Sequence, residues 1–278
     1  MEAKLFDKET IYFDNFEELF NFNKIEEIKI LLLNDLNLNI IPNEIDKIIN
    51  LKVLSVSYNN LSFLPESIKN LINLEIVILD SNKFTKIPEE LYSLPKLKKL
   101  IMYSNKICNL EKDIIKMEKL VHLGLSYNYI TILPSEIGYL NNLEYLDLRK
   151  NNLINLPKSI VNLNNLKNFS ISNNKLNQLP KNMNKLIKLE RLDLDNNNLL
   201  FIPKQIFKAP SIKLIHANFN NLKNLPNCFS KSKQLKYLSC ICNNFSTQYS
   251  SSKLIINPDD IYKIDSHITS IKILEEFI

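Results

Sequence analysis

The chain of 278 residues contains only 2 glycines and no long uninterrupted apolar run. So few glycines exclude the phosphate-binding loops GxGxxG and GxxxxGKS/T, because both need glycines where the backbone approaches a phosphate. Without a run of about 18 uncharged apolar residues, or an apolar stretch behind a basic start, the sequence predicts neither a transmembrane helix nor a signal peptide. Its 45% apolar and 23% charged residues are typical of a globular protein with a buried core.

Cysteine is also scarce, and none lies in the first hundred residues: the four are Cys108, Cys228, Cys240 and Cys242. A secreted repeat protein of this size usually closes its ends with paired cysteines. The three N-x-S/T sequons do not favour secretion, because about four are expected by chance among 41 asparagines. They lie at Asn60, Asn168 and Asn244. We therefore expect the reducing cytoplasm, with the nucleus as the alternative.

Residue types that carry catalysis do not form a recognisable constellation. The three histidines, His122, His216 and His267, have no serine, cysteine or carboxylate spaced to form a nucleophile and base. Cys240 and Cys242 form one Cys-x-Cys pair, but no second pair completes a zinc site. We therefore predict no catalytic, cofactor-binding or metal-ligating residue and no cofactor, and we expect the chain not to be an enzyme.

Two residue types recur with a period of 23. Prolines occupy one station of this period, with Glu111 in the fourth place: Pro42, Pro65, Pro88, Pro134, Pro157, Pro180, Pro203 and Pro226. An asparagine column has the same period: Asn59, Asn82, Asn105, Asn128, Asn151, Asn174, Asn197, Asn220 and Asn243. A fixed period of this length indicates a solenoid, in which each repeat contacts only its neighbours.

One unit reads Leu143-x-x-Leu146-x-Leu148-x-x-Asn151-x-Leu153-x-x-Leu156-Pro157-x-x-Ile160-x-x-Leu163. This pattern resembles the leucine-rich repeat family, and specifically the 23-residue LP-type units of the Ras-group intracellular leucine-rich-repeat scaffolds. The resemblance covers residues 28 to about 248. It implies an α/β fold: a curved horseshoe solenoid with a parallel sheet on its concave face and short helical or irregular convex arms. It also implies a scaffold that acts in small-GTPase signalling.

The residues themselves favour the same fold. Leu146 and Leu148 alternate with polar residues, so one set of side chains points inward and the next outward, as a short strand requires. One repeat cannot bury its own apolar side chains, each worth about 1.5–3 kcal/mol when buried, so the units must stack. We expect the asparagine column to satisfy backbone groups where the chain leaves each strand. Leu36 occupies this station in the first unit.

Both ends of the array are predicted to be caps, because an open solenoid end exposes apolar surface and a strand edge. Residues 1–27 are the predicted N-terminal cap, with a strand over Ile11-Tyr12-Phe13 and a covering helix that begins after Asp14-Asn15. Residues 28–248 are the predicted array of about ten repeats. Residues 249–278 are the predicted C-terminal cap, with a helix whose alternative role is docking to a partner.

The outward residues of the strands form the concave face, which we predict to bind a protein. Ile78, Ile101, Tyr103, Tyr127 and Tyr145 are expected to form one exposed patch, and tyrosine and arginine are common interface hot spots. The predicted site residues are Tyr58, Ile78, Ile101, Tyr103, His122, Tyr127, Tyr145, Asp147, Arg149, Arg191, Asp193 and Phe219. The alternative is a strand surface that simply favours β-branched and aromatic residues.

The net charge of +5 is unevenly distributed along the chain. Residues 1–139 carry 16 basic and 20 acidic side chains (−4), and residues 140–278 carry 19 and 10 (+9). Such polarity would orient a charged partner, and the alternative is solvated edge charge. On the concave face the bases are offset by aspartates, so a nucleic-acid partner is not expected.

We therefore predict a non-enzymatic scaffold or adaptor, monomeric on its own, that binds a partner protein in signalling. The resemblance offers a small GTPase or a phosphatase as the partner, but the matching residues are framework residues and do not identify it. Three alternatives stay open. They are a regulatory subunit of a protein phosphatase, a structural component of a cytoskeletal assembly, and a weak RNA binder. The phosphatase regulators resemble a 22-residue repeat, whereas the period here is 23.

Overall fold

The computed structural model describes residues 1–5, 9–226, 228, 232 and 234–245. The strands are β1 (Glu2–Lys4), β2 (Thr10–Tyr12), β3 (Ile30–Leu32), β4 (Val53–Ser55), β5 (Ile76–Ile78), β6 (Lys99–Ile101), β7 (His122–Gly124), β8 (Tyr145–Asp147), β9 (Asn168–Ser170), β10 (Arg191–Asp193), β11 (Leu214–His216) and β12 (Tyr237–Ser239). There is one short α-helix, α1 (Phe16–Phe20), among the described residues. The 3-10 helices are η1 (Ile25–Glu27), η2 (Asn43–Lys47), η3 (Glu66–Asn70), η4 (Glu89–Ser93), η5 (Lys112–Lys116), η6 (Ser135–Tyr139), η7 (Lys158–Asn162), η8 (Met183–Lys185) and η9 (Ile206–Lys208).

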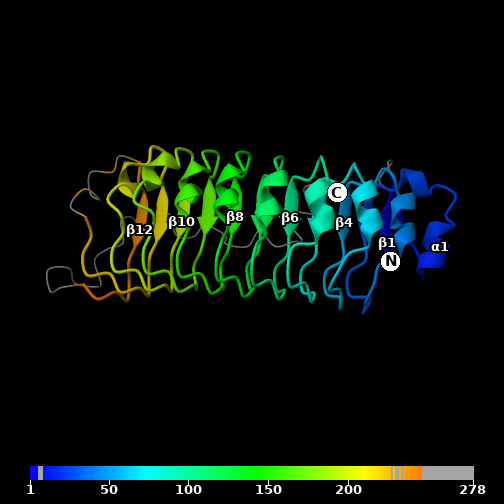
Figure 1. Ribbon diagram of the computed structural model, residues 1–278, viewed down its shortest axis with the longest axis horizontal. Coiled ribbons are helices and arrows are strands. Elements are labelled where there is room, and N and C mark those ends of the chain that lie inside the picture. The colour runs from blue at the N-terminus through cyan, green and yellow to red at the C-terminus, as the bar shows by residue number, and fades with distance from the viewer. Residues whose placement is uncertain (6–8, 227, 229–231, 233, 246–278) are drawn as a thin grey trace.

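The strands form a single sheet in the order β12-β11-β10-β9-β8-β7-β6-β5-β4-β3-β1-β2. From β3 to β12 every pairing is parallel, and the register is constant: Leu146 pairs with Leu123 on one side and Phe169 on the other. The strands stand side by side along the long axis, and the short helical turns form a second row (Figure 1). The predicted solenoid is confirmed.

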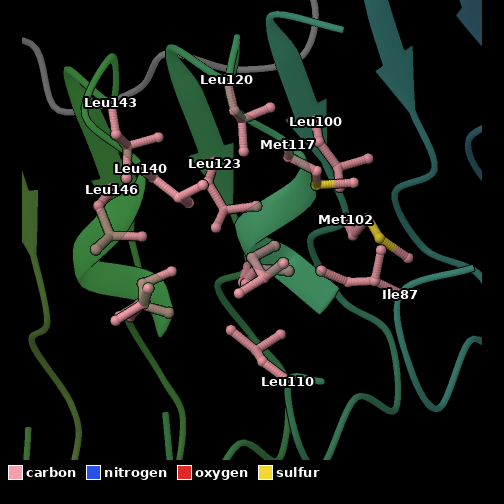
Figure 2. Packing of buried hydrophobic residues seen from close by; sticks show 14 of the residues in the cluster. Ile87, Leu100, Met102, Leu110, Met117, Leu120, Leu123, Leu140, Leu143 and Leu146 are labelled. Atoms are coloured by element: carbon pink, nitrogen blue, oxygen red, sulfur yellow. The ribbon is translucent and has the colours of Figure 1, made fainter. Parts of the chain in front are cut away.

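The core lies between the sheet and the row of helical turns. Leu100, Leu123 and Leu146, from three consecutive strands, follow one another in a row and are buried (Figure 2). On the other side of the core, the 3-10 helices η2 to η9 each bury at least one apolar residue, such as Ile114 in η5 and Ile137 in η6. Each layer of the core is completed only by the next repeat, which is why the array stacks.

The proline station sets the extended backbone that leads directly into the 3-10 helices η2 to η7. Pro134 has φ −67° and ψ 153°, and Glu111, which replaces proline in the fourth repeat, has φ −75° and ψ 154°. Proline favours this φ, but any residue can adopt it. The substitution therefore leaves the repeat geometry unchanged.

The asparagine column satisfies backbone groups, as predicted. Asn128 Nδ2 donates to the carbonyl oxygens of Met102 at 2.9 Å and Leu125 at 3.1 Å, and its Oδ1 accepts the Ile107 N–H at 2.9 Å. The same bonds recur from Asn59 to Asn243. At the first station Leu36 offers no amide, and its own N–H donates to Asn59 Oδ1 at 3.1 Å. The column thus ties each repeat to the one before it.

The N-terminal segment extends the sheet with an antiparallel pair. Strand β2 lies close to the predicted strand, and α1 follows the N-cap Asn15, whose side chain accepts the Glu18 N–H at 2.9 Å. Strand β1 pairs with both β2 and β3 and was not predicted, because Ala3 is its only apolar residue. The predicted C-terminal cap of residues 249–278 lies outside the described residues.

Candidate functional site on the concave face

The concave face of β3 to β6 is an aliphatic cluster. Its buried members are Ile30, Val53, Ile76, Ile78 and Ile101. The expectation that Ile78 and Ile101 are exposed is wrong, because both have an exposed fraction of 0%. Neighbouring strands lie about 4.8 Å apart, so branched side chains on adjacent strands pack sideways against one another. These two residues support the sheet and do not form an open patch.

Tyr103 was also expected in the exposed patch, but it is largely buried. Its ring lies over Gly124 of β7, where a Cβ atom would stand 2.8 Å from the Tyr103 hydroxyl oxygen. Its hydroxyl forms a hydrogen bond with Asp147. Burial raises the pKa of Tyr103 well above its ordinary value, and the carboxylates of Asp147 and Asp80 add to the effect. The hydroxyl is therefore a permanent donor that reaches two strands along the sheet.

Asp147 and Arg149 form a two-pronged ion pair. Arg149 Nε lies 2.9 Å from Asp147 Oδ1, and Nη2 lies 2.7 Å from Oδ2. The hydrogen bonds to Asp147 raise the pKa of Arg149, against the opposing effect of burial. With exposed fractions of 13% and 24% for the two side chains, this pair is shielded enough to be fixed in place.

A cavity of about 140 Å³ opens over β9 on this face. It arises because β9 presents the short side chains Asn168 and Ser170 between longer ones on β8 and β10. Its lining consists of Tyr103, His122, Tyr145, Leu146, Asp147, Arg149, Asn168, Ser170, Arg191 and Asp193. We call this cavity the β9 slot.

Arg191 stands on the β10 side of the β9 slot. Burial lowers its pKa, the nearby carboxylate of Asp193 opposes this, and the guanidinium of Arg149 adds to it. Unlike Arg149, Arg191 makes no side-chain hydrogen bond or ion pair with any residue that the structure describes. Arg191 therefore carries a partly buried charge whose N–H groups donate to no described residue.

Aromatic rings complete the other wall. His122 and Tyr145, on neighbouring strands, stack with ring centroids 5.4 Å apart and an interplanar angle of 15°. His122 is the buried ring of this stack. The expectation that it is an exposed contact residue is therefore wrong. Tyr145 remains partly exposed at the mouth of the slot. Tyr145 is therefore the more accessible of the two rings.

A separate row of large side chains lies where the chain leaves the strands. Tyr58, Tyr127 and Phe219 have φ angles of 57°, 56° and 54° and are exposed. This left-handed conformation costs a bulky residue on the order of 1 kcal/mol. The ammonium of Lys150, at the next such station, lies 4.3 Å from the centroid of the Tyr127 ring. This row lines one edge of the sheet and does not line the β9 slot.

The β9 slot therefore gathers seven of the twelve predicted site residues: Tyr103, His122, Tyr145, Asp147, Arg149, Arg191 and Asp193. The other five lie outside it: Tyr58, Ile78, Ile101, Tyr127 and Phe219. The prediction missed Asn168 and Ser170, which form the floor, and Gly124, which makes room for Tyr103. Their signal was the contrast between these short outward residues and the longer ones at the same stations of neighbouring repeats.

The remaining chemistry of the described residues is sparse. They contain no group of three or more His, Cys, Asp or Glu side chains arranged to hold a metal ion. All four cysteines are described and are free, and burial raises the pKa of Cys240 to about 12, which keeps it a core thiol. Within the same part of the chain, no helix is long and apolar enough to cross a membrane.

Several solved structures share this architecture. A leucine-rich-repeat protein of Leptospira interrogans is 27% identical, with a TM-score of 0.54 over 79% of this chain and 68% of that chain. The plant peptide hormone receptor RGFR1, solved in complex with RGF2, is 26% identical, with a TM-score of 0.61. The alignment covers 77% of this chain but only 39% of the receptor chain. An internalin of Listeria monocytogenes, 18% identical with a TM-score of 0.61 over 86% of this chain and 72% of that chain, shares the fold alone.

Family profiles match most of the repeat array. The profile described as a leucine rich repeat matches residues 49–107, 72–130 and 187–240. A second, described as a leucine-rich repeat region, matches residues 102–175. A comparison with curated proteins returns no significant match. The repeat register, the asparagine ladder and these matches agree, and the chain belongs to the leucine-rich repeat family.

Proposed function

We propose that this protein is a non-enzymatic scaffold that binds a partner protein at the β9 slot on its concave face. The observation that carries the proposal is the grouping of Tyr145, Arg149 and Arg191 around one cavity. Tyrosine and arginine dominate the energetics of protein interfaces, because they offer large contact areas and several donors. The framework beneath them is held by the asparagine ladder, so the site is organised before a partner arrives.

The family supports a binding role. Leucine-rich repeats are typically a binding fold, and the plant peptide hormone receptor RGFR1 is bound to RGF2 in its solved structure. Because this chain spans less than half of that receptor, its ligand is not carried over. The small-GTPase or phosphatase partner suggested by the Ras-group resemblance also stays a hypothesis. We place the protein in a reducing compartment, which its free and scattered cysteines favour.

Site-specific photo-crosslinking tests the proposal. A benzophenone amino acid replaces Tyr145 in one protein and Tyr139 in another. Tyr139 lies in η6 of the preceding repeat, on the convex side, and is 57% exposed. We expect partner crosslinks from position 145 that unlabelled wild-type protein suppresses, and none of these from position 139. Equal crosslinking from both positions, or crosslinks only from position 139, would overturn the concave site.

A further inference from the structure

We propose that the β9 slot receives the carboxylate of an aspartate or glutamate side chain on the partner, with Arg191 as the group that binds it. This inference rests on the proposed function and specifies the partner's chemistry: an acidic side chain presented by a peptide segment. Three features of the site support it: the shape of the slot, the hydrogen-bonding groups that are still open, and the difference between its two arginines.

The shape admits one side chain. The floor strand β9 carries Asn168 and Ser170, and the walls rise from β8 and β10, its immediate neighbours in the sheet. With strands about 4.8 Å apart, the walls stand roughly 10 Å from each other at their base. That width accepts a single side chain or one extended peptide segment, and the slot volume of about 140 Å³ agrees with this.

The open hydrogen-bonding groups of the slot are mostly donors. Tyr145, Asn168 and Ser170 make no side-chain hydrogen bond with any described residue, and Arg191 adds the N–H groups of its guanidinium. Hydroxyl and amide groups can also accept, but a guanidinium can only donate. A carboxylate, with two oxygens and only acceptor capacity, is the side chain that matches this set best.

The two arginines differ in what they already bind. Arg149 donates from Nε and Nη2 to the two carboxylate oxygens of Asp147, so these two donor groups are already engaged. Arg191 has no such partner among the described residues, although its side chain is partly buried. A guest carboxylate would give Arg191 the two-pronged partner that Arg149 has within the chain. A guest ammonium or guanidinium would instead leave Arg191 unpaired and more deeply buried.

Asp193 limits how tightly a carboxylate can bind. One of its oxygens accepts the Asp195 N–H at 3.2 Å, and no guanidinium forks onto it as Arg149 does onto Asp147. Its negative charge repels an acidic guest and attracts a basic one. Replacement of Asp193 by asparagine should therefore strengthen binding of an acidic guest and weaken binding of a basic one. The variant tests the sign of the guest's charge.

The experiment is a selection of random short displayed peptides on immobilised wild-type protein. Selected peptides are then measured against Arg191→Gln, Asp193→Asn and Lys188→Gln. Lys188 is an exposed lysine three residues before Arg191 and outside the slot, so its replacement removes the same charge without touching the site. Circular dichroism confirms that each variant is folded.

We expect the selected peptides to share an aspartate or glutamate at one aligned position. Its replacement by the matching amide should weaken binding to the wild type about tenfold and leave binding to Arg191→Gln unchanged. Asp193→Asn should bind more tightly, and Lys188→Gln should match the wild type. NMR gives a second readout. The Arg191 Nε–H signal should broaden or shift on addition of the acidic peptide, and the Arg149 Nε–H signal is the internal control.

Two failures are distinguishable. Peptides that need Tyr145 but carry no acidic position, or that bind Asp193→Asn more weakly, would overturn the carboxylate inference and leave the proposed binding site standing. Peptides whose binding is unaffected by Tyr145→Ala and Arg191→Gln, or the absence of any selected peptide, would overturn the inference and count against the proposed function as well.

Discussion

The two halves of the concave face share one backbone and differ in what they present. In β3 to β6 the outward residues are mainly aliphatic, as at Ile76 and Ile78, and they are buried against one another. In β8 to β10 the same stations carry charged or polar residues, such as Asp147, Ser170 and Asp193, around a cavity. Register and asparagine ladder are unchanged across the boundary. Outward stations of this solenoid can therefore either extend the core or form a site.

The boundary between the halves is Gly124 on β7. Without a side chain there, Tyr103 of the preceding repeat can lie over the strand and bind Asp147 on the next one. The aliphatic cluster packs against this tyrosine on one side, and the β9 slot begins on the other. Because Gly124 has no side chain, Tyr103 can connect the two halves. We call β3 to β6 the supporting half, and β8 to β10, with the β9 slot, the proposed binding half.

The largest expected effect is a difference in the free energy of unfolding between substitutions at equivalent stations of the two halves. Ile78 and Ser170 are both the third residue of their strand. Ile78→Ala should lower the free energy of unfolding by about 3 kcal/mol, because it leaves a cavity among packed side chains. Ser170→Ala should change it by less than about 0.5 kcal/mol. Urea denaturation measures both, and similar losses would show that the halves do not differ as described.

The boundary itself can be broken at Gly124. Gly124→Ala should destabilise the protein by about 1–3 kcal/mol, because the added methyl group collides with the Tyr103 ring. The double variant with Tyr103→Ala should lose less than the sum of the two single changes, since the collision is then absent. Denaturation of all four proteins measures this coupling. Additive losses would mean that Tyr103 does not depend on Gly124.

The ion pair of the binding half can be compared with an exposed pair of the other half. Asp147→Asn should cost about 1–2 kcal/mol, because it leaves the shielded Arg149 without its charged partner. Lys69→Gln removes a partner of the exposed Glu66 in η3 and should cost clearly less than Asp147→Asn, because an ion pair in water gains little. The same denaturation assay applies, and a larger loss for Lys69→Gln would contradict the assignment.

The smallest expected effect is on pH dependence. Burial raises the pKa of Asp195 above its usual 3.8, and the charge of Asp193 adds to this, against hydrogen bonds from Asn218. The folded state therefore binds this proton more tightly, so stability falls as the pH rises from about 4 through the raised pKa. Asp195→Asn should remove this fall. His216, which interacts with Asp195, is replaced by glutamine in both proteins. An unchanged profile would contradict the raised pKa.

The sequence predicted the fold well because the framework is periodic. Leucines, prolines and the column from Asn59 to Asn243 repeat at fixed spacing, and each position has one structural role in every unit. The N-cap at Asn15 followed from a local rule, and the short helical turns agree with what the family resemblance implied. Strand β1 did not, because its pairing depends on contacts with β3 that no local pattern shows.

The site was predicted only in part, because exposure depends on neighbours across strands. The outward register of Ile78, Ile101 and His122 was predicted, but not their burial, which comes from side chains 23 residues away. Arg149 and Arg191 look equivalent in sequence, and only the structure shows that one is paired with Asp147. The floor of the β9 slot was missed because small residues carry no signal alone.

The most direct test of the central claim is the affinity of the partner captured through position 145 for three folded proteins. They are the wild type, Tyr145→Ala in the binding half, and Ile78→Val in the supporting half. Calorimetric titration should show a dissociation constant at least tenfold higher for Tyr145→Ala than for the wild type, and an unchanged one for Ile78→Val. Equal affinity of Tyr145→Ala and the wild type would contradict the claim that the β9 slot is the binding site.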